Sequence, residues 1–263
     1  MERRTRRILF YSALLTFLLL GYGLVVFALG YKYDFVRDEF LKTGSFQIEA
    51  NVSADVYVND RLTGRTSFLD NSFTASRLLP RTYSVRVQSA GYQTWRKDIE
   101  INAGALVKYP TVVLLPQRFN EELVPDGATS PTSPRVLPDK RLSPSEPKTE
   151  REMTSPDGEK YLTFDNHEIW VKWLRDSGSQ PFKKTGDNEL ITRFAQPVKD
   201  VQWHRGSSHV IADVGGILEF IEIDTRGGIN IFEIAAAEAG FYYDKNQNAV
   251  YKSDEKDLIK INL

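Results

Sequence analysis

The feature that most constrains this chain is an uncharged apolar run near its N-terminus. Residues Ile8–Tyr31 are 24 consecutive residues without a charged side chain. As an α-helix this run is about 36 Å long, enough to cross the roughly 30 Å hydrocarbon core of a bilayer. Because no water is available there, a crossing segment must pair its backbone groups internally, as a helix does. The run therefore predicts a transmembrane helix, with the lipid bilayer as the partner of residues 8–31.

The charges that flank the run predict its orientation. Arg3, Arg4, Arg6 and Arg7 precede it, and a segment of mixed charge follows it. Basic residues are enriched on the cytoplasmic side of membrane helices. We therefore expect a single-pass protein of the cell membrane, with a cytoplasmic N-terminus and extracytoplasmic C-terminal domains.

A cleaved signal peptide is the alternative interpretation of the same run. The small-residue pattern at Val26–Ala28 resembles a cleavage site. The apolar core, however, exceeds the usual length of about 7–15 residues in a signal peptide, which favours an uncleaved anchor. Either interpretation places the rest of the chain outside the cytoplasm.

Composition narrows the possible functions. The 263 residues carry 34 Lys+Arg and 35 Asp+Glu, a net charge of -1, so no overall basic field favours nucleic acid as a partner. Cysteine is absent, which excludes disulfides, thiolate metal sites and cysteine nucleophiles. Three histidines leave little for metal or acid–base chemistry, and we expect no cofactor.

Residues 32–117 show the alternation of β-strands. Asp55–Val58 and Tyr83–Val87 place apolar side chains at every second position, and Asn59-Asp60 is a turn pair. Such runs at short spacing predict a small antiparallel β-sandwich with one buried and one wet face per sheet. Three further strands are expected over 46–48, 99–101 and 112–115.

The order of motifs in this segment resembles the PEGA domain. The motifs are Gly44-x-Phe46-x-Ile48, Ala54-x-Val56-Tyr57-Val58-Asn59-Asp60, Gly64-x-Thr66, Leu79-Pro80-x-x-Tyr83-x-Val85-x-Val87, Gly91-Tyr92-x-x-Trp95 and Leu114-Leu115-Pro116. The resemblance implies a β-sandwich of a cell-surface protein with a binding role and no known catalysis. Tyr92 and Trp95 would then face a ligand or fill the core, and the core is the better expectation.

Residues 118–154 predict a linker. Six of the 12 prolines fall here, among polar residues: Pro125, Pro131, Pro134, Pro138, Pro144 and Pro147. Proline lacks a backbone donor and fixes φ, so the segment favours a stiff, extended spacer over a helix or a sheet interior.

Residues 155–263 contain three similar units. Turns at Ser155–Gly158, Trp203–Gly206 and Asp244–Asn246 are each followed by two apolar strands, at a period of 40–48 residues. The middle unit has four expected strands, at 198–203, 209–213, 218–223 and 229–234, and the outer units look partial. This period with four strands is typical of propeller blades.

The turn Ser-Pro-Asp-Gly before an apolar strand also resembles the TolB-type and WD40-like propeller repeat. Three blades are too few to close a ring, since propellers use about four to eight. Open sheet edges invite pairing with another chain, so an oligomer could complete the blades. The sequence thus predicts an all-β protein apart from one N-terminal transmembrane helix: a small β-sandwich plus incomplete β-propeller-like repeats.

Motifs for catalysis are absent, and the sequence does not indicate an enzyme. There is no Gly-x-Ser-x-Gly elbow, no phosphate-binding glycine loop and no His-Glu-x-x-His. His167, His204 and His209 lie at or near expected turns, where we expect solvated or hydrogen-bonded side chains and no metal site. Asp157, Asp244 and Asn246 are residues that favour turns.

Two classes of function remain open. The first is a membrane-anchored binding or scaffold protein of the cell envelope, whose ligand is a protein or a polysaccharide recognised through Tyr92, Trp95, Trp170, Trp173 or Trp203. In this hypothesis the blades are displayed beyond a stiff spacer. The second is an extracytoplasmic hydrolase, or a sensory or assembly subunit, with the repeats as its platform. A hydrolase would need His204, an Asp and a Ser to meet in one cleft.

Overall fold

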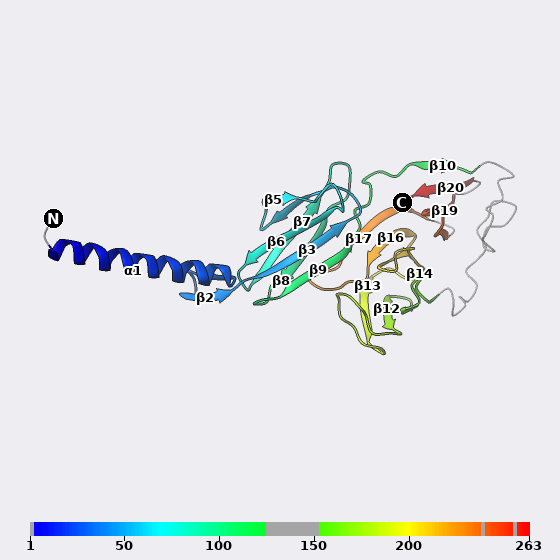
Figure 1. Cartoon of the computed structure of the whole chain (residues 1–263). Coiled ribbons are helices and arrows are strands. Elements are labelled where there is room, and N and C mark those ends of the chain that lie inside the picture. The colour runs from blue at the N-terminus through cyan, green and yellow to red at the C-terminus, as the bar shows by residue number, and fades with distance from the viewer. Residues whose placement is uncertain (1–2, 125–152, 238–239, 255–256) are drawn as a thin grey trace.

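The computed structural model describes residues 3–124, 153–237, 240–254 and 257–263. A single long helix projects from one end of an elongated molecule, a β-sandwich lies in the middle, and three smaller sheets lie at the far end (Figure 1). The all-β expectation, with one N-terminal helix, is confirmed. No closed barrel or propeller forms among the described residues.

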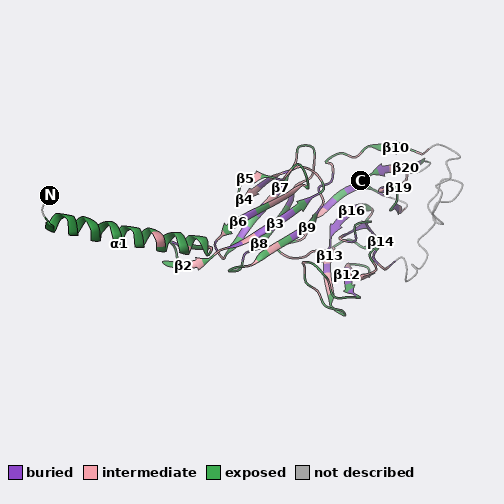
Figure 2. Ribbon diagram, viewed as in Figure 1, coloured by how far each residue is buried: buried purple, intermediate pink, exposed green. Residues whose placement is uncertain are grey.

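Helix α1 (Arg3–Ala28) carries the apolar run, and none of its residues is buried (Figure 2). It is long and apolar enough to cross a membrane, and its 18-residue apolar stretch has a mean hydropathy of 2.1. The helix ends where Gly30 adopts a φ of +83°, the left-handed conformation that glycine tolerates and that commonly terminates helices.

The end of α1 is fastened directly to the sandwich. The amide and the hydroxyl of Thr43 both donate to the carbonyl of Gly30, the hydroxyl at 2.7 Å. Arg77 donates from Nη2 to the carbonyl of Phe27 at 2.7 Å, and its guanidinium lies 3.3 Å from the centroid of the Phe27 ring. A cation at this position also complements the negative end of the helix dipole. Between these contacts runs a hairpin of β1 (Tyr31–Asp34) and β2 (Glu39–Lys42).

The sandwich consists of two sheets that share a buried core. One sheet has the order β6-β3-β9 and the other the order β5-β4-β7-β8. The strands are β3 (Gly44–Ala50), β4 (Asp55–Val58), β5 (Arg61–Arg65), β6 (Ser72–Leu78), β7 (Thr82–Gln88), β8 (Trp95–Glu100) and β9 (Leu106–Val112). The pairing of β3 with β9 is parallel, which the alternation could not predict because it reports which face is buried and not strand direction.

Local details of the sandwich agree with the sequence in one place and differ in another. Asn59 and Asp60 both have positive φ, at 49° and 61°, and form the expected two-residue hairpin turn. The prediction of a strand over 112–115 is wrong, because β9 ends at Val112. Residues 113–115 are irregular although largely buried. Pro110 lies inside β9, where it is tolerated because β9 is an edge strand.

Three sheets follow the sandwich in sequence. The first is β11-β12-β13, with β11 (Lys160–Phe164), β12 (Glu168–Trp173) and β13 (Asn188–Arg193). The second contains β14 (Val198–Trp203), β15 (His209–Val214), β16 (Ile217–Glu222) and β17 (Ile231–Ala236) in chain order, as expected for the middle unit. The third contains β18 (Phe241–Asp244), β19 (Ala249–Asp254) and β20 (Asp257–Asn262).

The third sheet gains a fourth strand from the segment expected to be a linker. Strand β10 (Glu121–Leu123) pairs antiparallel with β20, which gives the order β10-β20-β19-β18. Within 118–154, therefore, 121–123 is part of a sheet. The prolines of this segment lie at 125–147, outside the described residues. The edge of β20 is thus covered from within the chain.

The sandwich shares one hydrophobic core with the second and third C-terminal sheets, and the first sheet packs in a separate core with the second. Sandwich residues such as Trp95 and Ile99 and sheet residues such as Phe220, Phe232 and Ile261 belong to the same cluster of buried side chains. The amide of Asp98, on the outer edge of β8, donates to the carbonyl of Gly227 at 2.8 Å. The expectation of sheets displayed beyond a stiff spacer is therefore wrong, because they pack directly against the sandwich.

Candidate functional site

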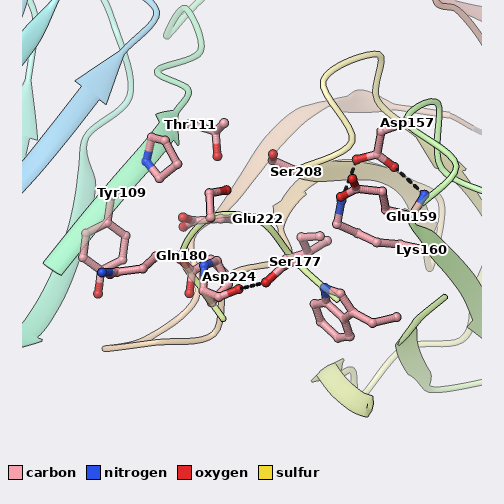
Figure 3. A pocket seen from close by; sticks show the side chains of 15 residues that line it. Tyr109, Thr111, Asp157, Glu159, Lys160, Ser177, Gln180, Ser208, Glu222 and Asp224 are labelled. Carbon is pink, nitrogen blue, oxygen red and sulfur yellow. Dashed lines mark hydrogen bonds and ion pairs between the residues drawn. The ribbon is translucent and has the colours of Figure 1, made fainter. Parts of the chain in front are cut away.

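A cleft of about 170 Å³ lies where the sandwich meets the first and second C-terminal sheets (Figure 3). Strand β9 forms one wall with Tyr109 and Thr111. The turn at 157–160 forms the opposite wall, and Glu222 and Asp224 lie at the end of β16. The cleft is smaller than the roughly 300–1,000 Å³ of typical small-molecule sites. It therefore suits one side group of a larger ligand.

Glu222 is held rigidly at this cleft. Its carboxylate lies 3.2 Å from the ammonium of Lys97, and it accepts hydrogen bonds from Trp95 Nε1 at 3.2 Å and Asn230 Nδ2 at 2.8 Å. Burial raises the pKa of Glu222 above its ordinary value, although Lys97 and Asn230 oppose this. Because Lys97 and Trp95 belong to the sandwich and Asn230 to the second sheet, Glu222 holds the sandwich and the second sheet together.

Lys97 is the unusual member of this group. It lies on the inward face of β8 and is only 2% exposed. Besides Glu222, its ammonium donates to the carbonyls of Asp224 and Gly228. All three donors of the lysine are thereby used, as a buried ammonium requires.

The opposite wall is organised by Asp157, in the Ser-Pro-Asp-Gly turn. Its carboxylate accepts from Ser155 Oγ at 2.5 Å, from the Glu159 amide at 2.9 Å and from Lys160 Nζ at 2.6 Å. Burial opposes ionisation of Asp157, but these donors outweigh it and lower its pKa. Gly158 has a φ of +71°, as the turn requires.

Glu159 is the acidic group left available in the cleft. Among the residues that the structure describes, no hydrogen bond or ion pair engages its carboxylate, whereas Asp157, Glu222 and Asp224 each have a basic partner. The cleft therefore carries one uncompensated negative charge. This charge favours a cationic or hydrogen-donating group of a ligand.

The aromatic rings of the cleft are already in contact with cations of the chain. Arg226 Cζ lies 4.5 Å from the ring centroid of Tyr109, and Lys183 Nζ lies 5.1 Å from that of Trp173. Burial raises the pKa of Tyr109 to about 12, so its hydroxyl is neutral. Stacking on a sugar ring would have to displace these cations.

The aromatic residues proposed from sequence are mostly internal. Trp95, Trp173 and Trp203 are at most 3% exposed, and Trp203 donates from Nε1 to the Met153 carbonyl. Tyr92 and Trp170 are half-buried. Only Trp173 lines the cleft, so these five side chains do not form one shared surface.

None of the histidines lines the cleft. His204 is buried, with Nε2 3.1 Å from Asn248 Oδ1 and the Gly206 amide donating to Nδ1. His209 stacks on Phe220 with ring centroids 4.6 Å apart. His167 borders a shallow hollow beside β12. No serine hydroxyl or carboxylate forms a hydrogen bond with the His204 ring among the described residues, and no group of three His, Asp or Glu in that part of the chain could hold a metal ion.

Sequence reasoning missed the cleft because three segments far apart in the chain build it. One signal was present: a lysine at the inward position of β8, between Trp95 and Ile99, implies a buried carboxylate partner. The identity of that partner depends on the tertiary packing of residue 222 against the sandwich.

Residues 43–113 match the family model for the PEGA domain. The resemblance expected from the sandwich motifs is thus confirmed, over 71 of the 263 residues. The match does not extend to the C-terminal sheets. No curated protein matches the chain.

Among solved structures, one similar chain comes from Bacteroides fragilis and is described as a candidate membrane-associated protein of unknown function. It is 9% identical, and the alignment covers 84% of this chain and 98% of that one, with a TM-score of 0.21.

Proposed function

We propose that this protein is a single-pass, membrane-anchored binding or scaffold protein of the cell envelope, without catalytic activity. Helix α1 would cross the membrane with Arg3, Arg4, Arg6 and Arg7 on the cytoplasmic side. The sandwich and the three sheets, which we take to be propeller-like repeats, would lie outside the cytoplasm. The PEGA-domain match and the exposed apolar helix support this assignment.

The observation that carries the binding role is the cleft between the sandwich and the sheets. Its walls are fixed by the Lys97–Glu222 and Asp157–Lys160 ion pairs, so it is formed before any ligand arrives. Preformed sites lose less entropy when they bind. With Glu159 as its uncompensated charge, the cleft suits a lysine or arginine side chain of an envelope protein, or an ammonium group of an amino sugar in a polysaccharide.

A crosslinking experiment tests this proposal. Full-length protein with a photoreactive residue at Ser179, an exposed position on the rim, is incubated with envelope extract and separately with purified cell-wall glycan. We expect a specific crosslinked product in one of the two, and its identity decides between protein and polysaccharide.

A matched pair of variants gives the control. Glu159→Gln removes the free charge of the cleft and should lower crosslinking about tenfold. Glu49→Gln removes an exposed charge on β3, which does not line the cleft, and should leave crosslinking unchanged. Equal crosslinking in both variants, or no product in either fraction, would contradict binding at this cleft.

A further inference from the structure

The β1–β2 hairpin presents an apolar tip that no other described part of the chain covers. Phe35 is 89% exposed and Val36 is 87% exposed, and Phe40 on β2 is 56% exposed. The ring of Tyr33 packs edge-on against Phe35 and against Phe40, with centroids 5.1 Å apart in both pairs. The tip is therefore an ordered aromatic cluster, and its outer surface is apolar.

Hydrogen bonds within the hairpin hold its turn in place. Asp34, which is buried, accepts at its carboxylate from the Val36 amide at 3.0 Å, and its carbonyl accepts from the Asp38 amide at 2.8 Å. The hydroxyl of Tyr33 donates to Asp38. These contacts fix the turn in a shape that leaves Phe35 and Val36 outermost. Outward apolar side chains on a fixed turn indicate an interaction surface.

The geometry fixes where this tip lies relative to α1. Both ends of the hairpin meet at Gly30, whose carbonyl accepts from Thr43 just beyond the end of α1. From there the hairpin turns back along the helix axis, toward its N-terminal end (Figure 1). Four residues per strand at about 3.3 Å each place the tip roughly 13 Å from that base.

We infer that the hairpin tip inserts into the interfacial region of the extracytoplasmic leaflet, beside the transmembrane helix. This inference rests on the proposed membrane anchoring. The apolar residues 8–28 span about 31 Å, so the helix end lies near the boundary of the hydrocarbon core, and a tip that turns back reaches the lipid headgroups and the first acyl carbons. Aromatic side chains are enriched at this depth.

The charges of the hairpin limit the depth of insertion. It carries three basic and three acidic residues, namely Lys32, Arg37, Lys42, Asp34, Asp38 and Glu39. Arg37, Asp38 and Glu39 follow the apolar tip directly, and burying them in hydrocarbon would be costly. The hairpin is therefore expected at the interface and not in the bilayer centre.

A second exposed apolar site provides a matched control. Phe68, in the loop before β6, is 86% exposed. Arg77 near the end of β6 contacts the helix, so Phe68 lies at the opposite end of that strand, some 20 Å farther from the membrane by strand length. It matches the tip in exposure and character but cannot reach the same bilayer.

Site-specific fluorescence quenching tests the inference, because a cysteine-free chain allows a single thiol to be labelled anywhere. Val36→Cys, Leu18→Cys and Phe68→Cys are each labelled with an environment-sensitive dye and reconstituted as full chains. The vesicles contain phosphatidylcholine and phosphatidylglycerol at 3:1, with nitroxide on the headgroup or at acyl carbon 12. At position 36, the headgroup nitroxide should quench the dye at least about twice as strongly as the deep nitroxide does.

The controls separate failure of the inference from failure of the anchor. At position 18, in the middle of α1, the deep nitroxide should quench more strongly, and at position 68 neither should quench. Quenching at 18 but not at 36 would overturn the hairpin inference and leave the anchor standing. Stronger quenching by the deep nitroxide than by the headgroup nitroxide at position 36 would contradict insertion at the interface. Absence of quenching at 18 would overturn the anchor and the inference with it.

Discussion

At the scale of single residues, Lys97 and Glu222 show how one ion pair joins two parts of the chain. The pair is buried on both sides, with 0% and 5% of the side chains exposed. Such a pair contributes little net stability over an apolar replacement, but the loss of one partner leaves a buried charge without compensation. Its main effect is to specify how the sandwich and the second sheet fit together.

A double-mutant cycle tests this role. Lys97→Met alone should lower the free energy of unfolding by about 3–5 kcal/mol, because Glu222 then stays buried without its cation. The double variant Lys97→Met/Glu222→Gln should recover at least half of that loss. Denaturant titration of the full chain in detergent measures both values. Additive losses would show that the two side chains act independently.

His204 and His209 make stability depend on pH. Burial lowers the pKa of His204 to about 4 and that of His209 well below its ordinary value. Because unfolded histidines titrate near 6.5, the unfolded chain binds more protons as pH falls from 6.5 toward 4. Acidification in this window therefore favours unfolding, and the effect of His204 levels off below about pH 4.

The pH prediction can be measured through one variant. Between pH 6 and 4.5, His204→Gln should reduce the slope of the unfolding free energy against pH by about 1.4 kcal/mol per pH unit, the value for one proton. Identical slopes for wild type and the His204 variant would refute this assignment.

At the scale of elements, β10 is the strand that could not be foreseen. It has three residues, all exposed, and no alternation that distinguishes it from the polar segment that follows. What makes it a strand is the open edge of β20. The Val124 amide donates to the carbonyl of Leu258, directly opposite in the register, so Glu122 and Lys260 form the next hydrogen-bonded pair.

Proline substitutions test the pairing of β10. Glu122→Pro removes an amide that faces β20, and we expect amide exchange of residues 257–262 to become roughly tenfold faster. Leu123→Pro is the matched control, since the Leu123 amide faces away from β20 and an edge strand tolerates proline there. Exchange that is equally fast in both variants would show that β10 does not protect β20.

Elements with clear periodicity were predictable, and those defined by their neighbours were not. Strands β4, β7, β12 and β14–β17 follow the expected alternation or spacing, and the turn at 59–60 has the expected positive φ values. The last strand of the sandwich was predicted too late in the chain, at 112–115, because Pro110 lies inside the actual strand β9 and proline is unfavourable in most strands. The candidate site was missed for the same reason as β10: its parts meet only through tertiary packing.

At the scale of the whole molecule, the sandwich and the sheets form one body. Asn230 connects them, since its side chain accepts from the Arg96 amide at 2.9 Å and donates to the Arg96 carbonyl at 3.1 Å. Asn51 makes the same two kinds of bond with Leu114 inside the sandwich. A shared core predicts that the two parts unfold together.

Calorimetry of the wild-type protein and of variants at these two asparagines tests that prediction. Wild-type protein should show a single transition, and Asn230→Ala should lower stability by about 1–3 kcal/mol and split the transition in two. Asn51→Ala should lower stability by a similar amount but keep one transition. Two transitions in the wild type would contradict a single cooperative body.

The pairing of β10 with β20 also has a consequence for biogenesis. Residue 123 leaves the ribosome 134 residues before residue 257, a delay of about 7–27 s at typical rates of synthesis. During that interval the third sheet cannot be completed, whichever side of the membrane the chain has reached. A nascent chain interrupted before residue 257 would keep β10 as an unpaired strand, which quality-control proteases could use to distinguish it from the finished product.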